Sequence, residues 1–160
     1  MVSHNKKKIS DSASIALNRK ARHDYSIESE YEAGVVLLGW EVKAIREGRV
    51  QLSESHVIFR LGEAYLLNCH IAPTAYISTH VVPDEARTRK LLLNKRELNK
   101  LAGQVTQQGY TVVPLSMYWK ANRIKLQIAL AKGKKLYDKR ADLKDRDWAR
   151  QKERLRKNAY

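Results

Sequence analysis

The residues that could carry chemistry as nucleophiles or metal ligands stand alone in this sequence. Cys69 lies next to His70, but neighbours on a strand point to opposite faces, so the two would not share a site. We interpret Cys69 as a small buried side chain. The five histidines are scattered singly, at His4, His23, His56, His70 and His80. Zinc, phosphate-loop and serine-hydrolase spacings do not occur, so the sequence indicates no enzyme, no metal site and no cofactor.

Cations beside aromatic side chains indicate a different chemistry, the binding of a polyanion. Arg87-Thr88-Arg89-Lys90 precedes a leucine run and the start of a predicted helix, where side chains, backbone N–H groups and the helix dipole can contact phosphates. Arg123 and Lys125 lie beside Tyr118 and Trp119, a combination suited to stacking on RNA bases and neutralising the RNA backbone. The alternative for the two aromatic residues is packing in the core or at a sheet edge, and the sequence leaves both open.

The charge distribution supports a polyanionic partner. The 160 residues include 31 Lys+Arg and 17 Asp+Glu, a formal net charge of +14. Residues 1–25 carry +4, residues 26–130 carry +3 and residues 131–160 carry +7. Such an excess indicates RNA, DNA or an acidic membrane. The sequence has neither an apolar run of about 18 residues nor a secretory signal, so we expect an intracellular protein that does not span a membrane.

Alternation and turn residues predict the elements that must position these side chains. Strands are expected at 25–32, 33–38 (with a bulge or bend near a glycine), 56–60, 64–68, 113–119 and 124–130, and helices at 40–47 and from Asn94 to Gly109. Asn94 is the expected helix cap, and Pro114 should lie at a sheet edge or a bulge. One strand is predicted to turn Val113, Leu115, Met117 and Trp119 to one face, and the next Ile124, Leu126, Ile128 and Leu130.

These elements favour a mainly β fold with flanking helices, a small antiparallel barrel of oligonucleotide-binding type rather than an α/β fold. We expect a basic N-terminal arm at 1–14, an RNA-binding barrel at 15–130 and a basic tail at 131–160. The tail has helix-supporting pairs at Asp142/Arg146 and Glu153/Lys157 but little apolar surface. It is predicted to be disordered when free and helical in an RNA-lined groove; a basic helix on a membrane surface is the weaker alternative.

Five blocks in order resemble small protein B, the SsrA-binding protein family of bacteria, over Ile15 to Asn158. The blocks are NRKARHDY at 18–25, YEAG at 31–34, GWEVK at 39–43, RTRKLLL at 87–93 and AKGKKLYDKR at 131–140. The resemblance implies an oligonucleotide-binding-type barrel and a cytoplasmic, monomeric, non-enzymatic protein. It would bind the tRNA-like domain of transfer-messenger RNA and deliver it to stalled ribosomes for trans-translation, meeting elongation factor Tu through the charged RNA. A ribosomal or ribosome-assembly protein of similar charge and fold is the alternative.

The resemblance also assigns roles to residues. It implies RNA contacts at Glu32, Leu92, Asn94 and Lys125, to which the basic and aromatic patterns add Arg87, Arg89, Lys90 and Trp119. It places His23 near the ribosomal decoding centre and the tail in the empty message channel, with the tail motif at Gly133, Lys134, Lys135, Tyr137, Asp138, Lys139 and Arg140. Asn94 could cap its helix or reach RNA, two uses that compete. His56 replaces the tyrosine of many relatives, which leaves less ring area for stacking.

Overall fold

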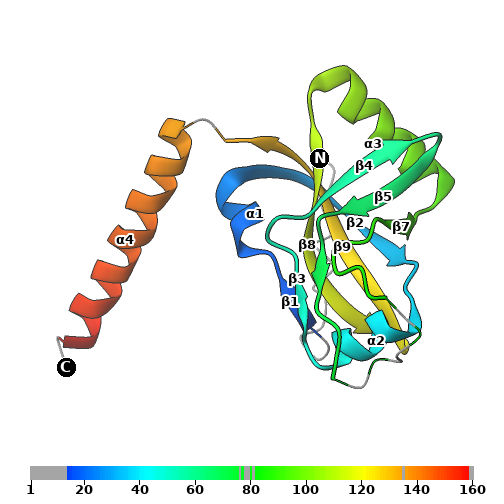
Figure 1. The fold of residues 1–160 in the computed structure, drawn as a ribbon. Helices are drawn as coiled ribbons and strands as arrows, with labels where there is room; N and C mark the ends of the chain where they lie inside the picture. Colours follow the sequence, from blue (N-terminus) through cyan, green and yellow to red (C-terminus); the bar gives the residue numbers. More distant parts are fainter. Residues whose placement is uncertain (1–13, 76, 78–79, 81, 135, 159–160) are drawn as a thin grey trace.

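The computed structural model describes residues 14–75, 77, 80, 82–134 and 136–158 (Figure 1). The strands are β1 (Ser14–Leu17), β2 (Tyr25–Val35), β3 (Val50–Gln51), β4 (His56–Arg60), β5 (Glu63–Leu67), β6 (His70–Ile71), β7 (Arg89–Leu92), β8 (Thr111–Lys120) and β9 (Arg123–Gly133). The helices are α1 (Arg19–Asp24), α2 (Gly39–Arg46), α3 (Lys95–Gln108) and α4 (Leu136–Asn158).

Six strands form a closed antiparallel barrel. Around the ring, β8 is followed by β4, β5, β7, β2 and β9, and β9 pairs with β8 again. β1 pairs with the second half of β8, while β3 and β6 form a separate two-stranded sheet. The mainly β fold with flanking helices that the sequence predicts is confirmed.

The barrel interior is the main core of the molecule. All four apolar residues predicted to share a face of β9 lie in it: Ile124, Leu126, Ile128 and Leu130. Leu101 of α3 and Ala44 and Ile45 of α2 are buried in the same core. These contacts fix both helices on the barrel, with α2 at the lower end and α3 at the upper end in Figure 1.

A bulge in β8 corrects one sequence prediction. The register of β8 on β9 shifts between Pro114 and Ser116, so the alternation of side chains changes face there. Val113 and Leu115 consequently pack in a second cluster outside the barrel, beneath α1, whereas Met117 lies in the main core. The prediction that the odd-numbered residues 113–119 share one face is wrong because it assumed an unbroken strand. The prediction that Pro114 lies at a sheet edge or a bulge is confirmed, because the bulge begins there.

β2 corrects a second prediction. The sequence indicated one strand at 25–32 and another at 33–38, but a single strand runs from Tyr25 to Val35. Its bulge lies between Ile27 and Ser29 instead of near a glycine, and Val36 and Leu38 are exposed. Polar and half-buried residues alternate along the first part of β2 as predicted, so one face of the strand is solvated.

The predicted end of the second helix at Gly109 is confirmed, and other residues at positive φ form the turns. Gly109 ends α3 with φ 68°, and Gly48 follows α2 with φ 73°. The β8–β9 hairpin turns at Ala121 and Asn122, both at positive φ, which is the backbone of a tight two-residue hairpin loop.

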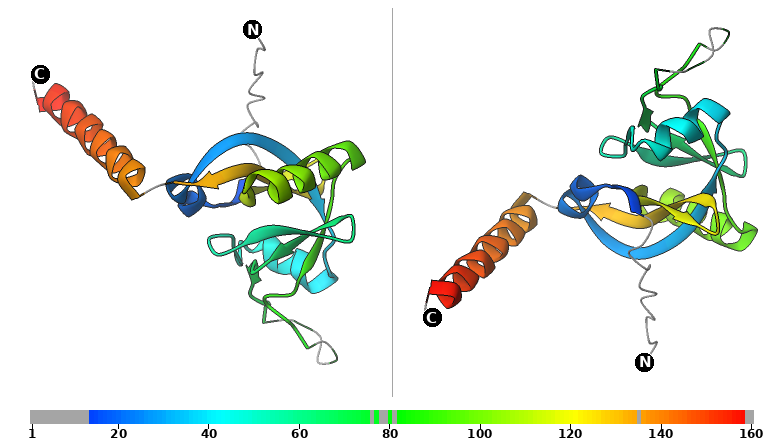
Figure 2. Two further views of the ribbon diagram at one scale, coloured as in Figure 1. Left: turned by 90° about the horizontal axis from the view of Figure 1, so that it is seen from above. Right: turned by 90° about the horizontal axis from the view of Figure 1, so that it is seen from below.

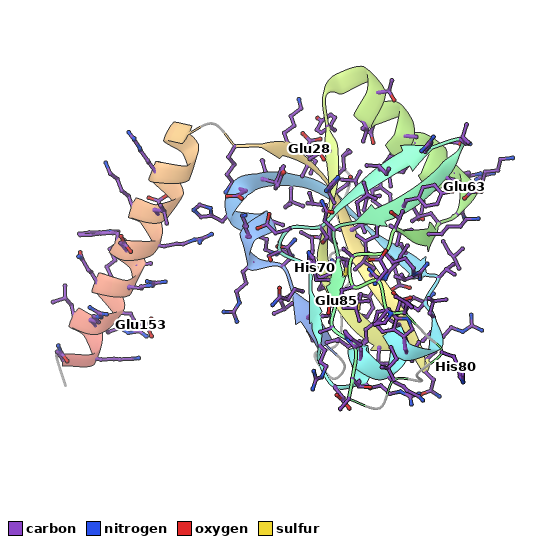
Figure 3. The ribbon with its side chains drawn as sticks, viewed as in Figure 1. Glu28, Glu63, His70, His80, Glu85 and Glu153 are labelled. Carbon is purple, nitrogen blue, oxygen red and sulfur yellow. The ribbon has the colours of Figure 1, made fainter. Side chains whose placement is uncertain are left out.

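α4 stands apart from the barrel in each view of Figures 1 and 2. Its apolar side chains are solvated: Trp148 is 60% and Leu155 71% exposed. The ammonium of Lys157 lies 3.3 Å from the carboxylate of Glu153, as the spacing predicts. Side chains project from all sides of the helix (Figure 3). No helix in the described part of the chain is long and apolar enough to cross a membrane.

Candidate nucleic-acid interface

Three strands bring Leu92, Gly34 and Lys125 into one row on the outer face of the barrel. Gly34 of β2 pairs with Leu92 of β7 on one side and with Lys125 of β9 on the other. Lys125 in turn pairs with Tyr118 of β8. Directly paired residues point to the same face of a sheet. Leu92 is 54% exposed, and its side chain lies against Gly34, where an added Cβ would be 3.2 Å from the Leu92 Cβ.

Glu32 lies one step along β2 on the same outer face. Its carboxylate accepts a hydrogen bond from the Tyr118 hydroxyl at 2.5 Å and contacts the Lys120 ammonium at 3.1 Å. Burial alone would raise the pKa of Glu32, but the hydrogen bonds from Tyr118 and Lys120 and the charges of Lys120 and Lys125 outweigh burial and hold that pKa below its ordinary value. Glu32 is therefore ionised at neutral pH beside two lysines.

Asn94 follows this row at the start of α3. Its side-chain oxygen accepts a hydrogen bond from the backbone N–H of Arg96 at 3.0 Å, so it caps the helix as predicted. The cap uses only the oxygen, because the amide nitrogen of the same side chain is a donor. Asn94 is exposed, and capping and binding therefore need not compete. We call the set Glu32, Gly34, Leu92, Asn94 and Lys125 the outer row.

The burial of Arg89 contradicts the prediction that this residue contacts RNA. It is fully buried, and its guanidinium pairs with the buried carboxylate of Glu41. Its nitrogens also donate to the backbone oxygens of Cys69 at 2.7 Å and Arg87 at 3.0 Å. A side chain inside the protein cannot reach a phosphate. Alternation along β7 explains the difference, because Arg89 and Leu91 point inward while Leu92 points outward.

Arg87 and Lys90 are held by carboxylates. Arg87 donates to Glu41 at 2.6 Å and is only 28% exposed. Lys90 lies on the outward face of β7, 3.6 Å from the carboxylate of Glu63, a hairpin residue labelled in Figure 3. Of these two cations, only Lys90 is placed on the same face as Leu92.

Trp119 points away from the outer row. It packs against the main core, with the guanidinium of Arg46 5.9 Å from its ring centre. Its neighbour Tyr118 takes the outward position and is 4% exposed beneath Glu32. The structure therefore resolves the alternatives for these rings by placing Trp119 mainly in packing and Tyr118 under the candidate interface.

His23 and the start of the tail lie together at the opposite end of β2 and β9. Tyr25 pairs with Gly133, and the backbone N–H of Lys134 donates to the oxygen of Asp24 at 2.9 Å. The His23 ring lies 2.9 Å from the carboxylate of Asp24. Gly34 lies nine residues beyond Tyr25 along β2, about 30 Å at the usual rise.

The remaining tail residues are only partly described. Arg140 is exposed on α4. Lys135 lies outside the described residues, as do the side chains of Tyr137, Asp138 and Lys139. His56 begins β4 and is half-buried, lining a hollow of about 280 Å³ with Asn18 and Lys20.

Cys69 is buried as the sequence indicates. Burial raises the pKa of its thiol to about 11, so the thiol stays protonated and unreactive at neutral pH. His70 is exposed, on the other side of the chain. Among the residues that the structure describes, no group of three or more His, Cys, Asp or Glu side chains could hold a metal ion.

Sequence reasoning missed three residues around the outer row. Gly34 was part of a matched block without a role of its own, and Lys120 was given no role. Glu41, the partner of both arginines, lies in a block that gave no sign of burial. Alternation offered one usable signal: Met117 and Trp119 share a face, so the residue between them faces outward.

The chain is similar to known proteins in both sequence and fold. A family model described as SmpB protein matches residues 15–158. A solved structure described as "tmRNA-SmpB: a journey to the center of the bacterial ribosome" superposes with a TM-score of 0.62 at 46% identity, covering 76% of this chain and 85% of the other.

Proposed function

The chain belongs to the SmpB family, and we propose that it binds transfer-messenger RNA and acts with it on the ribosome in trans-translation. The observation that carries this proposal is the outer row. Leu92, Gly34 and Lys125 are paired across β7, β2 and β9, and Asn94 follows Leu92 by two residues at the exposed start of α3. Four members of the outer row, Glu32, Leu92, Asn94 and Lys125, are the residues for which the family resemblance implies RNA contact, and this agreement supports the proposal.

The chemistry of the outer row suits a folded RNA. Lys125 takes part in none of the ion pairs found among the described residues, so its charge is available to a phosphate. The ionised carboxylate of Glu32 can accept hydrogen bonds from base N–H groups or ribose 2′-hydroxyls. Leu92 adds an exposed apolar contact for a base. This combination reads shape and base edges as well as charge, which favours a specific RNA over any polyanion.

The proposal extends to the two ends of the molecule. The outer row would hold the tRNA-like domain of the RNA, while His23 and the tail would enter the decoding centre and the vacant message channel. Support comes from the pairing of Tyr25 with Gly133, which brings the tail out beside α1, about 30 Å along β2 from the outer row. The β2–β9 ladder would then hold two sites a fixed distance apart: the outer row, which binds the RNA, and the end near His23 and the tail, which contacts the ribosome.

A competition titration tests the proposal. The protein is titrated into the tRNA-like domain at about 0.2 M salt, which suppresses nonspecific phosphate binding by orders of magnitude. An ordinary tRNA and a DNA duplex serve as competitors. We expect tight binding that neither competitor displaces, and a marked loss with Glu32→Ala and Lys125→Ala combined. Weak binding, equal for the three nucleic acids, would contradict the proposal and favour a general basic RNA-binding protein.

A further inference from the structure

The carboxylate of Glu32 is held in place by two side chains of β8. Its Oε2 accepts from the Tyr118 hydroxyl at 2.5 Å and from the Lys120 ammonium at 3.1 Å, and its Oε1 lies 3.2 Å from the same ammonium. A carboxylate offers about four acceptor positions. Three are used within the described residues, which leaves an acceptor position on Oε1 for a ligand.

The support beneath Glu32 is rigid. Tyr118 is 4% exposed and lies in the middle of the longest part of the β8–β9 ladder, directly paired with Lys125. Its hydroxyl has one described partner, the carboxylate of Glu32. A ring locked by packing presents its hydroxyl at one point, whereas the glutamate side chain alone would move among several rotamers.

We infer that Tyr118 is a positioning residue for RNA recognition and that Lys120 contributes to the same effect. Together the two side chains hold the Glu32 carboxylate so that its open acceptor position faces a hydrogen-bond donor of the RNA. This inference rests on the proposed function, because it names how one residue of the outer row is prepared for its ligand. An acceptor fixed before binding loses less conformational freedom on binding, so positioning raises affinity without any direct contact between Tyr118 and RNA.

The charged groups around Glu32 predict how its ionisation depends on this support. Tyr118 and Lys120 face it from β8, Lys125 from β9, and Glu30 lies on the same face of β2. Removing the Tyr118 hydroxyl takes away a hydrogen bond that lowers the pKa of Glu32 and leaves the burial that raises it. The pKa of Glu32 should therefore rise, and RNA binding should begin to fail at a higher pH.

Tyr118→Phe tests the inference, and Tyr110→Phe is its matched control. The Tyr110 hydroxyl also donates to a glutamate, Glu28 (labelled in Figure 3), at 2.7 Å. That pair lies beside Lys132, and Glu28 comes six residues before Gly34 along β2. Affinity for the tRNA-like domain is measured from pH 3.5 to 8 at about 0.2 M salt, a range that reaches below 4.5, the ordinary pKa of a glutamate carboxyl. The titration of the Glu32 carboxyl carbon is followed by NMR in the protein without RNA.

We expect Tyr118→Phe to weaken binding about tenfold at pH 7. We also expect it to move the acid limb of the affinity profile and the NMR titration of Glu32 to higher pH, while Tyr110→Phe changes none of them. Lys120→Gln should act in the same direction with a smaller effect, and because Lys120 is exposed it tests the inference even if Tyr118→Phe folds poorly. RNA bases that titrate in this range affect every variant equally.

Two results would overturn the inference, and they are distinguishable. In the first, Glu32→Gln loses affinity while Tyr118→Phe and Lys120→Gln match the unmodified protein in affinity and pH profile. The inference that β8 positions Glu32 would then be wrong, while the proposal that the outer row binds RNA would still hold. If Glu32→Gln itself binds like the unmodified protein, the proposed RNA face is wrong as well.

Discussion

Glu41 and Arg89 form the most deeply buried ion pair among the described residues, since both side chains are 0% exposed. Arg87 joins them from the surface, and the backbone N–H of Leu38 donates to the same carboxylate at 2.8 Å. The group ties α2 to β7 and to the segment that leads into β7. This buried group therefore fixes α2 and the segment before β7 against the barrel, and β7 is the strand that carries Leu92.

Breaking this pair should destabilise the protein strongly. Glu41→Gln leaves the Arg89 guanidinium buried without a compensating charge, and we expect a loss of about 3–5 kcal/mol in the free energy of unfolding, measured by urea denaturation at pH 7. Lys20→Gln, which breaks the exposed pair between Lys20 and Glu54, is the control and should leave the urea midpoint unchanged. Equal midpoints for both variants would contradict the structural role of the buried pair.

The same carboxylate should make stability depend on pH. Burial would raise the pKa of Glu41, but hydrogen bonds from Arg87, Leu38 and Arg89 hold it below its ordinary value of 4.5. A depressed pKa in the folded state gives stability that is present above 4.5 and is lost as the pH falls through the folded pKa. The stability difference between the unmodified protein and Glu41→Gln should therefore shrink below pH 4.5, and a constant difference from pH 7 to pH 3 would contradict this assignment.

At the scale of elements, local signals predicted well and long-range partners did not. The cap at Asn94 and the helix end at Gly109 depend on a few adjacent residues, and both are confirmed. The face assignment in β8 failed because a bulge beyond Pro114 changes the alternation, and pattern reading cannot locate the extra residue. The burial of Arg89 depends on Glu41, 48 residues away, which no local pattern reveals.

The candidate site shows the same difference between local signals, which the sequence reveals, and long-range partners, which it does not. The outer row was assembled by resemblance, and the register of β7, β2 and β9 explains why its members meet. The support of Glu32 by Tyr118 and Lys120 spans 86 and 88 residues of sequence, so only the closed barrel makes it visible.

The two uses of Asn94 can be separated by substitution. Asn94→Ser keeps an oxygen that caps α3 and removes the amide donor, so stability should be retained while RNA affinity falls severalfold. Asn94→Ala removes both, and should cost about 1 kcal/mol of stability in addition to the affinity. Thermal unfolding and the titration with the tRNA-like domain measure the two effects. Undiminished RNA binding by both variants would show that Asn94 serves only as a cap.

At the scale of the whole molecule, the described contacts divide the chain at Lys134. Ala131 is buried and paired with Thr111, and β9 continues to Gly133, so these residues complete the barrel. The backbone N–H of Lys134 donates a hydrogen bond to the backbone oxygen of Asp24, at the end of α1. Beyond it, residues 135–160 carry ten Lys/Arg and five Asp/Glu, a net +5. A barrel ending at Lys134 keeps the outer row and loses α4.

We therefore expect truncation after Lys134 to separate RNA binding from ribosome rescue. The shortened protein should retain the thermal stability of the full chain and nearly all its affinity for the tRNA-like domain at about 0.2 M salt, where a net +5 on a distant segment contributes little. Peptide tagging on a message without a stop codon, measured in reconstituted translation, should be lost.

A chain cut after Leu130 is the informative comparison, because it also removes the β9 residues that pair with Tyr25 and Ser26 and should lose stability. Tagging that survives truncation at Lys134 would contradict the role proposed for the tail, whereas loss of RNA affinity there would show that the barrel does not bind the RNA by itself.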